Sequence, residues 1–143
     1  MELGPVIRIV TRRTIDAYEE ILGIGNPLHF DEDYASKTPF GGIIAHGMMS
    51  LAYISEMMGR TLGEGWYEGG ELDTAFVLPV RPGDTITTRG RITGQKEVNG
   101  ETYVVCEVYC ENQKGQKVLR GTAAARAGGG EKSLNWRHPQ PPF

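Results

Sequence analysis

The sequence predicts an α+β fold in which one antiparallel sheet wraps around a single long helix. Residues 45–58 are apolar on almost every side, and Glu56 is their only formal charge. Such a run suits a helix of about 14 residues, whereas a bilayer span needs about 20. A helix without a polar face must be enclosed by other elements. The four strand-like segments that follow it are expected to form this enclosure.

The segments before the central helix predict a strand, a helix and a long loop. Residues 6–10 are short and β-branched, which indicates a first strand or a lead-in. Residues 15–22 have apolar positions at helical spacing, with Thr14 as the expected N-cap and a glycine just beyond. Residues 26–44 form the loop, with a short helical turn expected at 31–36. Loops of this length in compact domains are often functional.

The second half of the chain predicts an antiparallel meander. Its strand candidates are bounded by turn residues, and they are 72–80, 84–96, 102–111 and 117–126. Asn99-Gly100 between two of them is typical of a tight hairpin. Residues 59–70 are rich in glycine and are expected to be a turn region. A long apolar helix followed by a meander is the hot-dog arrangement, whose open sheet edge favours a dimer.

Composition limits the classes of function. The 143 residues fit one domain, expected at 1–127, with a tail at 128–143 that is flexible or docks on a partner. A net charge of −3 without a basic block argues against nucleic-acid binding, and no segment has the pattern of a signal peptide or a membrane span. Cys106 and Cys110, about 13 Å apart on a strand, are expected to be reduced packing residues. We therefore expect a cytoplasmic protein without a metal site.

Two residues near the start of the central helix are candidates for chemistry. His29 lies on a loop that Pro27 stiffens, and a histidine can transfer protons near neutral pH. Gly47 lies where the unpaired N–H groups of a helix start could polarise a ligand carbonyl. Each also has a structural alternative. His29 could be a packed loop residue, and Gly47 could serve only to let the helix end pack tightly.

Four other polar residues have weaker functional cases. Asn26 could cap or orient the loop, and Asp31 could cap the turn that follows. His46 could bind backbone carbonyls near the helix start. Ser55 lies on the buried helix and needs a hydrogen-bond partner. Taken alone, each of the four favours a structural role.

These motifs resemble the MaoC-like family, which includes the R-specific enoyl-CoA hydratases. The similarity runs from about Tyr18 to Ser55, through Asn-Pro-Leu-His-x-Asp at 26–31 and Ile-Ala-His-Gly-Met at 44–48, and it returns at Val-Arg-Pro-Gly-Asp, 80–84. The resemblance implies a homodimer or higher homo-oligomer in which each chain helps to form the other's tunnel. It implies binding of acyl thioesters of coenzyme A or acyl carrier protein, and reversible addition of water to a trans-2-enoyl thioester. No cofactor is implied, because coenzyme A is part of the substrate.

The resemblance also implies a set of site residues. His29 and Gly47 are implied to be catalytic. Substrate contacts are implied for the residues around them, which are Asn26, Ile24, Phe40, His46, Met48 and Ser55. The family pairs its histidine with an aspartate five residues earlier, and this chain has Ile24 there. Isoleucine cannot transfer a proton, so the implied dyad is incomplete.

Three functions remain open from the sequence. The first is a hydratase or dehydratase in which Glu20, Asp31 or a group from a partner subunit replaces the missing carboxylate. The second is a non-catalytic subunit that binds acyl thioesters or supports a complete homologue. The third is a hot-dog thioesterase, which the hydratase-type motif at the helix start makes the least favoured. We predict the first.

Overall fold

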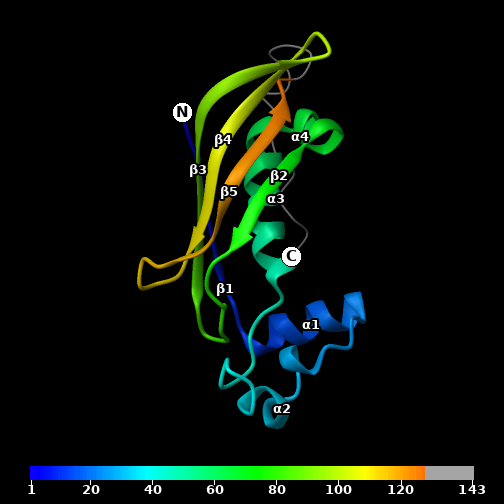
Figure 1. Cartoon of the computed structure of the whole chain (residues 1–143), viewed down its shortest axis with the longest axis vertical. Coiled ribbons are helices and arrows are strands. Elements are labelled where there is room, and N and C mark those ends of the chain that lie inside the picture. The colour runs from blue at the N-terminus through cyan, green and yellow to red at the C-terminus, as the bar shows by residue number, and fades with distance from the viewer. Residues whose placement is uncertain (128–143) are drawn as a thin grey trace.

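The computed structural model describes residues 1–127 and shows a five-stranded antiparallel sheet curved around one long helix (Figure 1). The strands are β1 (Glu2–Ile9), β2 (Glu71–Phe76), β3 (Thr85–Val98), β4 (Glu101–Glu111) and β5 (Lys117–Arg126), in the spatial order β1-β3-β4-β5-β2. The predicted α+β hot-dog fold is confirmed, whereas the predicted meander is wrong for its first strand, because β2 pairs with β5 and not with β3. The predicted tail, 128–143, lies outside the described residues.

Helix α3 (Gly47–Leu62) is the predicted central helix, and it packs against the sheet through β1, β3 and β4. Its fully buried side chains include Ile54, Met57 and Met58. Burial of one such side chain contributes about 1.5–3 kcal/mol relative to exposure. The sheet therefore holds α3 along most of its length, and the start of α3 points toward the N-terminal helices (Figure 1).

Residues 59–62 and 64–69 are helical, so the expectation of a turn region at 59–70 is wrong. The last turn of α3 and the short helix α4 (Glu64–Gly69) occupy this segment, separated by Gly63 at φ 52°. Trp66 explains why this segment is helical and not a turn. Its ring is buried and its indole N–H donates to the Ser55 hydroxyl at 2.9 Å. Tertiary packing thus overrides the glycine content.

The N-terminal elements begin at caps, and one differs from expectation. Helix α1 (Arg12–Leu22) is capped by Thr11, one turn earlier than predicted, because Thr11 and Thr14 exchange hydrogen bonds in a capping box. As predicted, Asn26 caps a 3-10 turn, η1 (Pro27–His29), and Asp31 caps α2 (Glu32–Ser36).

Two further predictions are confirmed in the sheet. Asn99 and Gly100 have positive φ values of 51° and 80°, as a two-residue hairpin between β3 and β4 requires. Cys106 and Cys110 are buried and unbridged. Of the helices in residues 1–127, none has the length and apolar character needed to span a bilayer.

Candidate functional site

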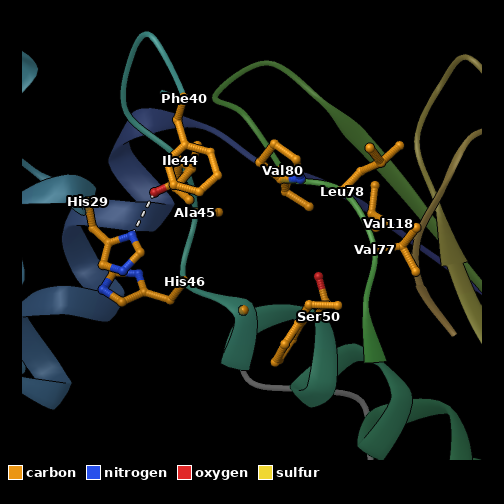
Figure 2. Close-up of a pocket in the computed structure, with 13 residues that line it drawn as sticks. His29, Phe40, Ile44, Ala45, His46, Ser50, Val77, Leu78, Val80 and Val118 are labelled. Carbon is orange, nitrogen blue, oxygen red and sulfur yellow. Dashed lines mark hydrogen bonds between the residues drawn. The ribbon is translucent and has the colours of Figure 1, made fainter. Parts of the chain in front are cut away.

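An apolar cavity of about 370 Å³ lies between the start of α3 and the segment that follows β2 (Figure 2). Its described lining comes from the loop before α3 (His29, Phe40, Ile44, Ala45 and His46), from α3 (Gly47 and Ser50), from residues 76–80 and from Val118. His29 and His46 are the only titratable side chains in this lining. The cavity therefore combines an apolar chamber with a pair of imidazoles at one end.

The orientation of His29 is determined by one hydrogen bond. Its Nδ1 lies 2.8 Å from the carbonyl oxygen of Ile44, the contact drawn in Figure 2. A carbonyl oxygen can only accept, so Nδ1 carries the proton and Nε2 is the unprotonated nitrogen of the neutral ring. Asn26 supports the turn, because its side chain accepts from the Leu28 N–H at 3.1 Å. His29 is thus presented at the cavity in the tautomer that a general base needs.

His46 is almost completely buried, with 3% of its surface exposed. Its ring stacks on His29 with centroids 3.9 Å apart and an interplanar angle of 25°, and Tyr18 contacts it edge-on. Nε2 lies 2.7 Å from Oε2 of Glu19, while Nδ1 has no hydrogen-bond partner among the described residues. The expectation that His46 binds backbone carbonyls is therefore wrong, because Glu19 reaches its ring from α1.

Glu19 is the residue that the sequence analysis missed. Its Oε1 accepts the N–H of Gly25 at 2.6 Å, and its Oε2 accepts from His46. The hydrogen bond from His46, followed by that from Gly25, lowers the pKa of the Glu19 carboxyl below its ordinary value. The available signal was the position of Glu19 four residues after Ile15, which is buried on α1. Positions i and i+4 share one helix face, so this carboxylate faces inward.

The two carboxylates proposed from the sequence do not reach the histidines. Glu20 is exposed and makes no hydrogen bond or ion pair with another described residue. Asp31 accepts the N–H of Tyr34 as the cap of α2. Of the acidic side chains described, Glu19 is the one bonded to an imidazole of the cavity.

Gly47 begins α3, and no described side chain caps this helix start. The start of a helix carries unpaired N–H groups and a partial positive charge, which suit a developing negative charge. The ring of Phe76 lies over Gly47, since a Cβ added there would come within 2.7 Å of Phe76 Cε1. The geometry therefore accommodates both explanations of this glycine, the close approach of a ligand and the packing of Phe76.

The other implied substrate-binding residues separate into two groups. Phe40 and His46 line the cavity. The remaining four lie outside the described lining, and they are Asn26, Ile24, Met48 and Ser55. Ile24 and Met48 are exposed, Asn26 caps η1, and Ser55 binds Trp66. Ser50, one turn after Gly47, is the α3 serine that lines the cavity. Their roles in substrate binding stay predictions.

Residues 1–127 contain no group of three or more His, Cys, Asp or Glu side chains arranged to hold a metal ion. The cavity's polar groups are two imidazoles and a hydroxyl, which suit proton transfer.

Comparison with known proteins identifies similar sequences and structures. The family model described as MaoC like domain matches residues 6–113. An (R)-specific enoyl-CoA hydratase from Rhodospirillum rubrum is 38% identical over 99 residues, which cover 68% of this chain and 66% of the relative. An (R)-specific enoyl-CoA hydratase from Aeromonas caviae is 32% identical over 130 residues, covering 88% and 95%. An R-hydratase structure from Pseudomonas aeruginosa has a TM-score of 0.72 and 26% identity, covering 87% of this chain and 78% of that one. The match thus spans just under two thirds of the Rhodospirillum rubrum relative and nearly all of the Aeromonas caviae relative.

Proposed function

This chain belongs to the MaoC-like family, and on that premise we propose that it adds water reversibly to a trans-2-enoyl thioester of coenzyme A or acyl carrier protein. Two similar proteins are named (R)-specific enoyl-CoA hydratases. The observation that carries the proposal is the contact of His29 Nδ1 with the Ile44 carbonyl oxygen at 2.8 Å. With Nδ1 bound to the Ile44 carbonyl, Nε2 is available as a base beside an apolar cavity.

The proposed reaction uses one base and one helix start. His29 Nε2 takes a proton from water while the water oxygen bonds to C3 of the enoyl group. The C2–C3 π electrons move toward the thioester, whose oxygen accepts from the Gly47 end of α3. The imidazolium then returns its proton to C2, which yields the 3-hydroxyacyl thioester and neutral His29. Dehydration is the reverse. These steps move only protons and electron pairs, so we propose that no cofactor is required.

The apolar cavity supports an acyl chain as the bound group. Its walls beyond the histidines include Phe40, Val80 and Val118. An acyl chain placed there would gain about 0.8 kcal/mol for each buried methylene. The charged nucleotide portion of coenzyme A would remain outside, in water.

We also propose a homodimer formed through β2. Among the described strands, β2 pairs only with β5, which leaves its second edge unpaired. The last residue of β2, Phe76, and the two residues that follow it, Val77 and Leu78, are exposed. Unpaired edges with exposed apolar residues favour association. Because residues 76–80 also line the cavity, a second subunit there would complete its wall. Sedimentation at micromolar concentration tests this, and a monomer would contradict it. We also propose a cytoplasmic location, which the unbridged cysteines Cys106 and Cys110 support because free thiols are typical of a reducing compartment.

The test of function is hydration of crotonyl-CoA, followed as loss of enoyl-thioester absorbance. We expect turnover by the wild type, and a fall of about 10²–10⁴-fold in His29→Ala because a general base is lost. His29→Asn is the matched control, since its amide N–H can still donate to the Ile44 carbonyl. Both variants should lose activity equally while their melting temperatures stay near the wild type.

Other outcomes would favour the alternatives. If crotonyl-CoA raises the melting temperature but is not turned over, the chain is a non-catalytic acyl-thioester-binding subunit. Release of free coenzyme A thiol would identify a thioesterase. If His29→Asn keeps the activity of the wild type while His29→Ala loses it, His29 has only a structural role.

A further inference from the structure

We propose that Glu19 is a positioning residue that acts through His46 to stabilise the protonated form of His29 during hydration. The inference rests on the proposed role of His29 as the base. It assigns to α1 the negative charge that the MaoC-like resemblance expects at position 24. Three side chains from separate elements form the series, in the order Glu19, His46 and His29.

The first link is the contact between Glu19 and His46. Both carboxylate oxygens are occupied, Oε1 by the Gly25 N–H at 2.6 Å and Oε2 by His46 Nε2 at 2.7 Å. A carboxylate with two such bonds is held in position and remains ionised at neutral pH. Since an ionised carboxylate only accepts, His46 must donate from Nε2. Glu19 therefore determines both the tautomer and the orientation of His46.

The second link is the stack between the two imidazoles. Their centroids lie 3.9 Å apart, so a charge on either ring acts strongly on the other. Two adjacent positive rings would repel, whereas one positive charge can be balanced by Glu19. The titratable groups against His46 among the described residues are Glu19 and Tyr18 from α1 and His29 from η1. Glu19 is the anion in this group. When His29 takes a proton from water, the charge that forms is one ring away from that anion.

The environment of His46 Nδ1 indicates that the Glu19–His46 pair has a role in the cavity. His46 Nδ1 is buried and lacks a partner among the described residues. An unpaired buried polar atom is unfavourable for folding, and such atoms need an explanation other than stability. His46 also lines the cavity. The pair is therefore better explained by its effect on His29 than as a structural bridge.

The location of Ile24 is consistent with Glu19 of α1 supplying the negative charge in place of an aspartate at position 24. Ile24 is 57% exposed and does not line the cavity. Its neighbour Gly25 donates to Glu19, so the carboxylate of α1 meets the same loop segment. The anion that meets this loop segment thus comes from the helix.

The first test is the pH profile of kcat/KM for crotonyl-CoA in Glu19→Gln. Glutamine can still accept a hydrogen bond but has no charge. A nearby negative charge favours the protonated, positively charged form of an imidazole. We therefore expect a loss of roughly tenfold or more in kcat/KM, and an acid limb that moves to lower pH because the imidazolium is less stable. Glu20→Gln removes the same charge from the neighbouring exposed residue and should stay within about twofold of the wild type.

Two results in this assay would overturn the inference. One is a kcat/KM in Glu19→Gln equal to that of Glu20→Gln. The other is a fall in kcat/KM with an unmoved acid limb, together with a lower melting temperature, because that pattern indicates a structural role.

The second test uses no substrate, so it separates this inference from the proposed function. Nitrogen-15 NMR of the wild-type histidines should show His46 protonated at Nε2 and His29 at Nδ1, and the resonances of both rings should change in Glu19→Gln but not in Glu20→Gln. If the wild type fails to hydrate crotonyl-CoA but these resonances behave as expected, the proposed function fails and the linkage stands. The opposite tautomer of His46 in the wild type, or a His29 resonance unaffected by Glu19→Gln, would overturn the linkage.

Discussion

Gly47→Ala distinguishes the two explanations of the glycine at the start of α3. The added Cβ would lie 2.7 Å from Cε1 and 2.8 Å from Cζ of Phe76. Ordinary carbon contacts are about 3.5–4.0 Å, so the ring must move by about 1 Å. Phe76 is at the end of β2 and is 61% exposed in the single chain, so the core of its own subunit does not lock its ring in place. We therefore expect a stability change below about 1 kcal/mol.

The expected effect on activity is larger. If the thioester oxygen accepts from the start of α3, the new methyl group blocks its approach to the backbone N–H. Removing one donor to a developing oxyanion costs about 10²–10³-fold in kcat, or about 2.7–4 kcal/mol. Crotonyl-CoA hydration by Gly47→Ala should therefore fall by about 10²-fold while the melting temperature changes little.

The control for this experiment removes the clash. Phe76→Ala leaves no ring for the new methyl group to meet, so the double variant Gly47→Ala/Phe76→Ala has an uncrowded residue 47. If Gly47 admits the ligand, the double variant stays as inactive as Gly47→Ala. If the glycine only accommodates Phe76, the double variant recovers the activity of Phe76→Ala, and the proposed oxyanion site is refuted.

Two further predictions concern Ile24 and Cys110. Ile24→Asp should fold normally because residue 24 is exposed, and hydration should rise less than about threefold if Glu19 already supplies the anion. A rise of tenfold or more in the same absorbance assay would refute that role of Glu19. Burial raises the pKa of the Cys110 thiol from 9.0 to about 11, with a hydrogen bond to Thr88 opposing the change. Because the folded state holds the thiol proton more tightly, this stabilising contribution is complete below pH 9.0 and is lost as the pH rises through about 11. Urea unfolding of the wild type and Cys110→Ala should show it, and fast reaction of native Cys110 with a thiol reagent near pH 8 would contradict it.

Local sequence chemistry determined much of this fold. The apolar run at 45–58 predicts α3, because a helix without a polar face must be buried. Asn99-Gly100 predicts the hairpin, because both residues tolerate positive φ. Asn26 and Asp31 predict their caps, because a short polar side chain bonds to N–H groups two or three residues ahead. Each of these signals depends on atoms that are near one another along the chain. His29 and Gly47 were found as candidates for the same reason, since each stands in a short motif.

The rest depended on how distant segments pack. Trp66 makes residues 64–69 helical by binding Ser55, although the glycines there indicate a turn. Ser50 rather than Ser55 lines the cavity, because packing of α3 on the sheet decides which side of an apolar helix faces the open space. Glu19 and His46 are 27 residues apart, and their contact requires α1 to pass the start of α3 at one particular orientation. Helical spacing shows that Glu19 faces inward, but only the tertiary structure brings that carboxylate to an imidazole.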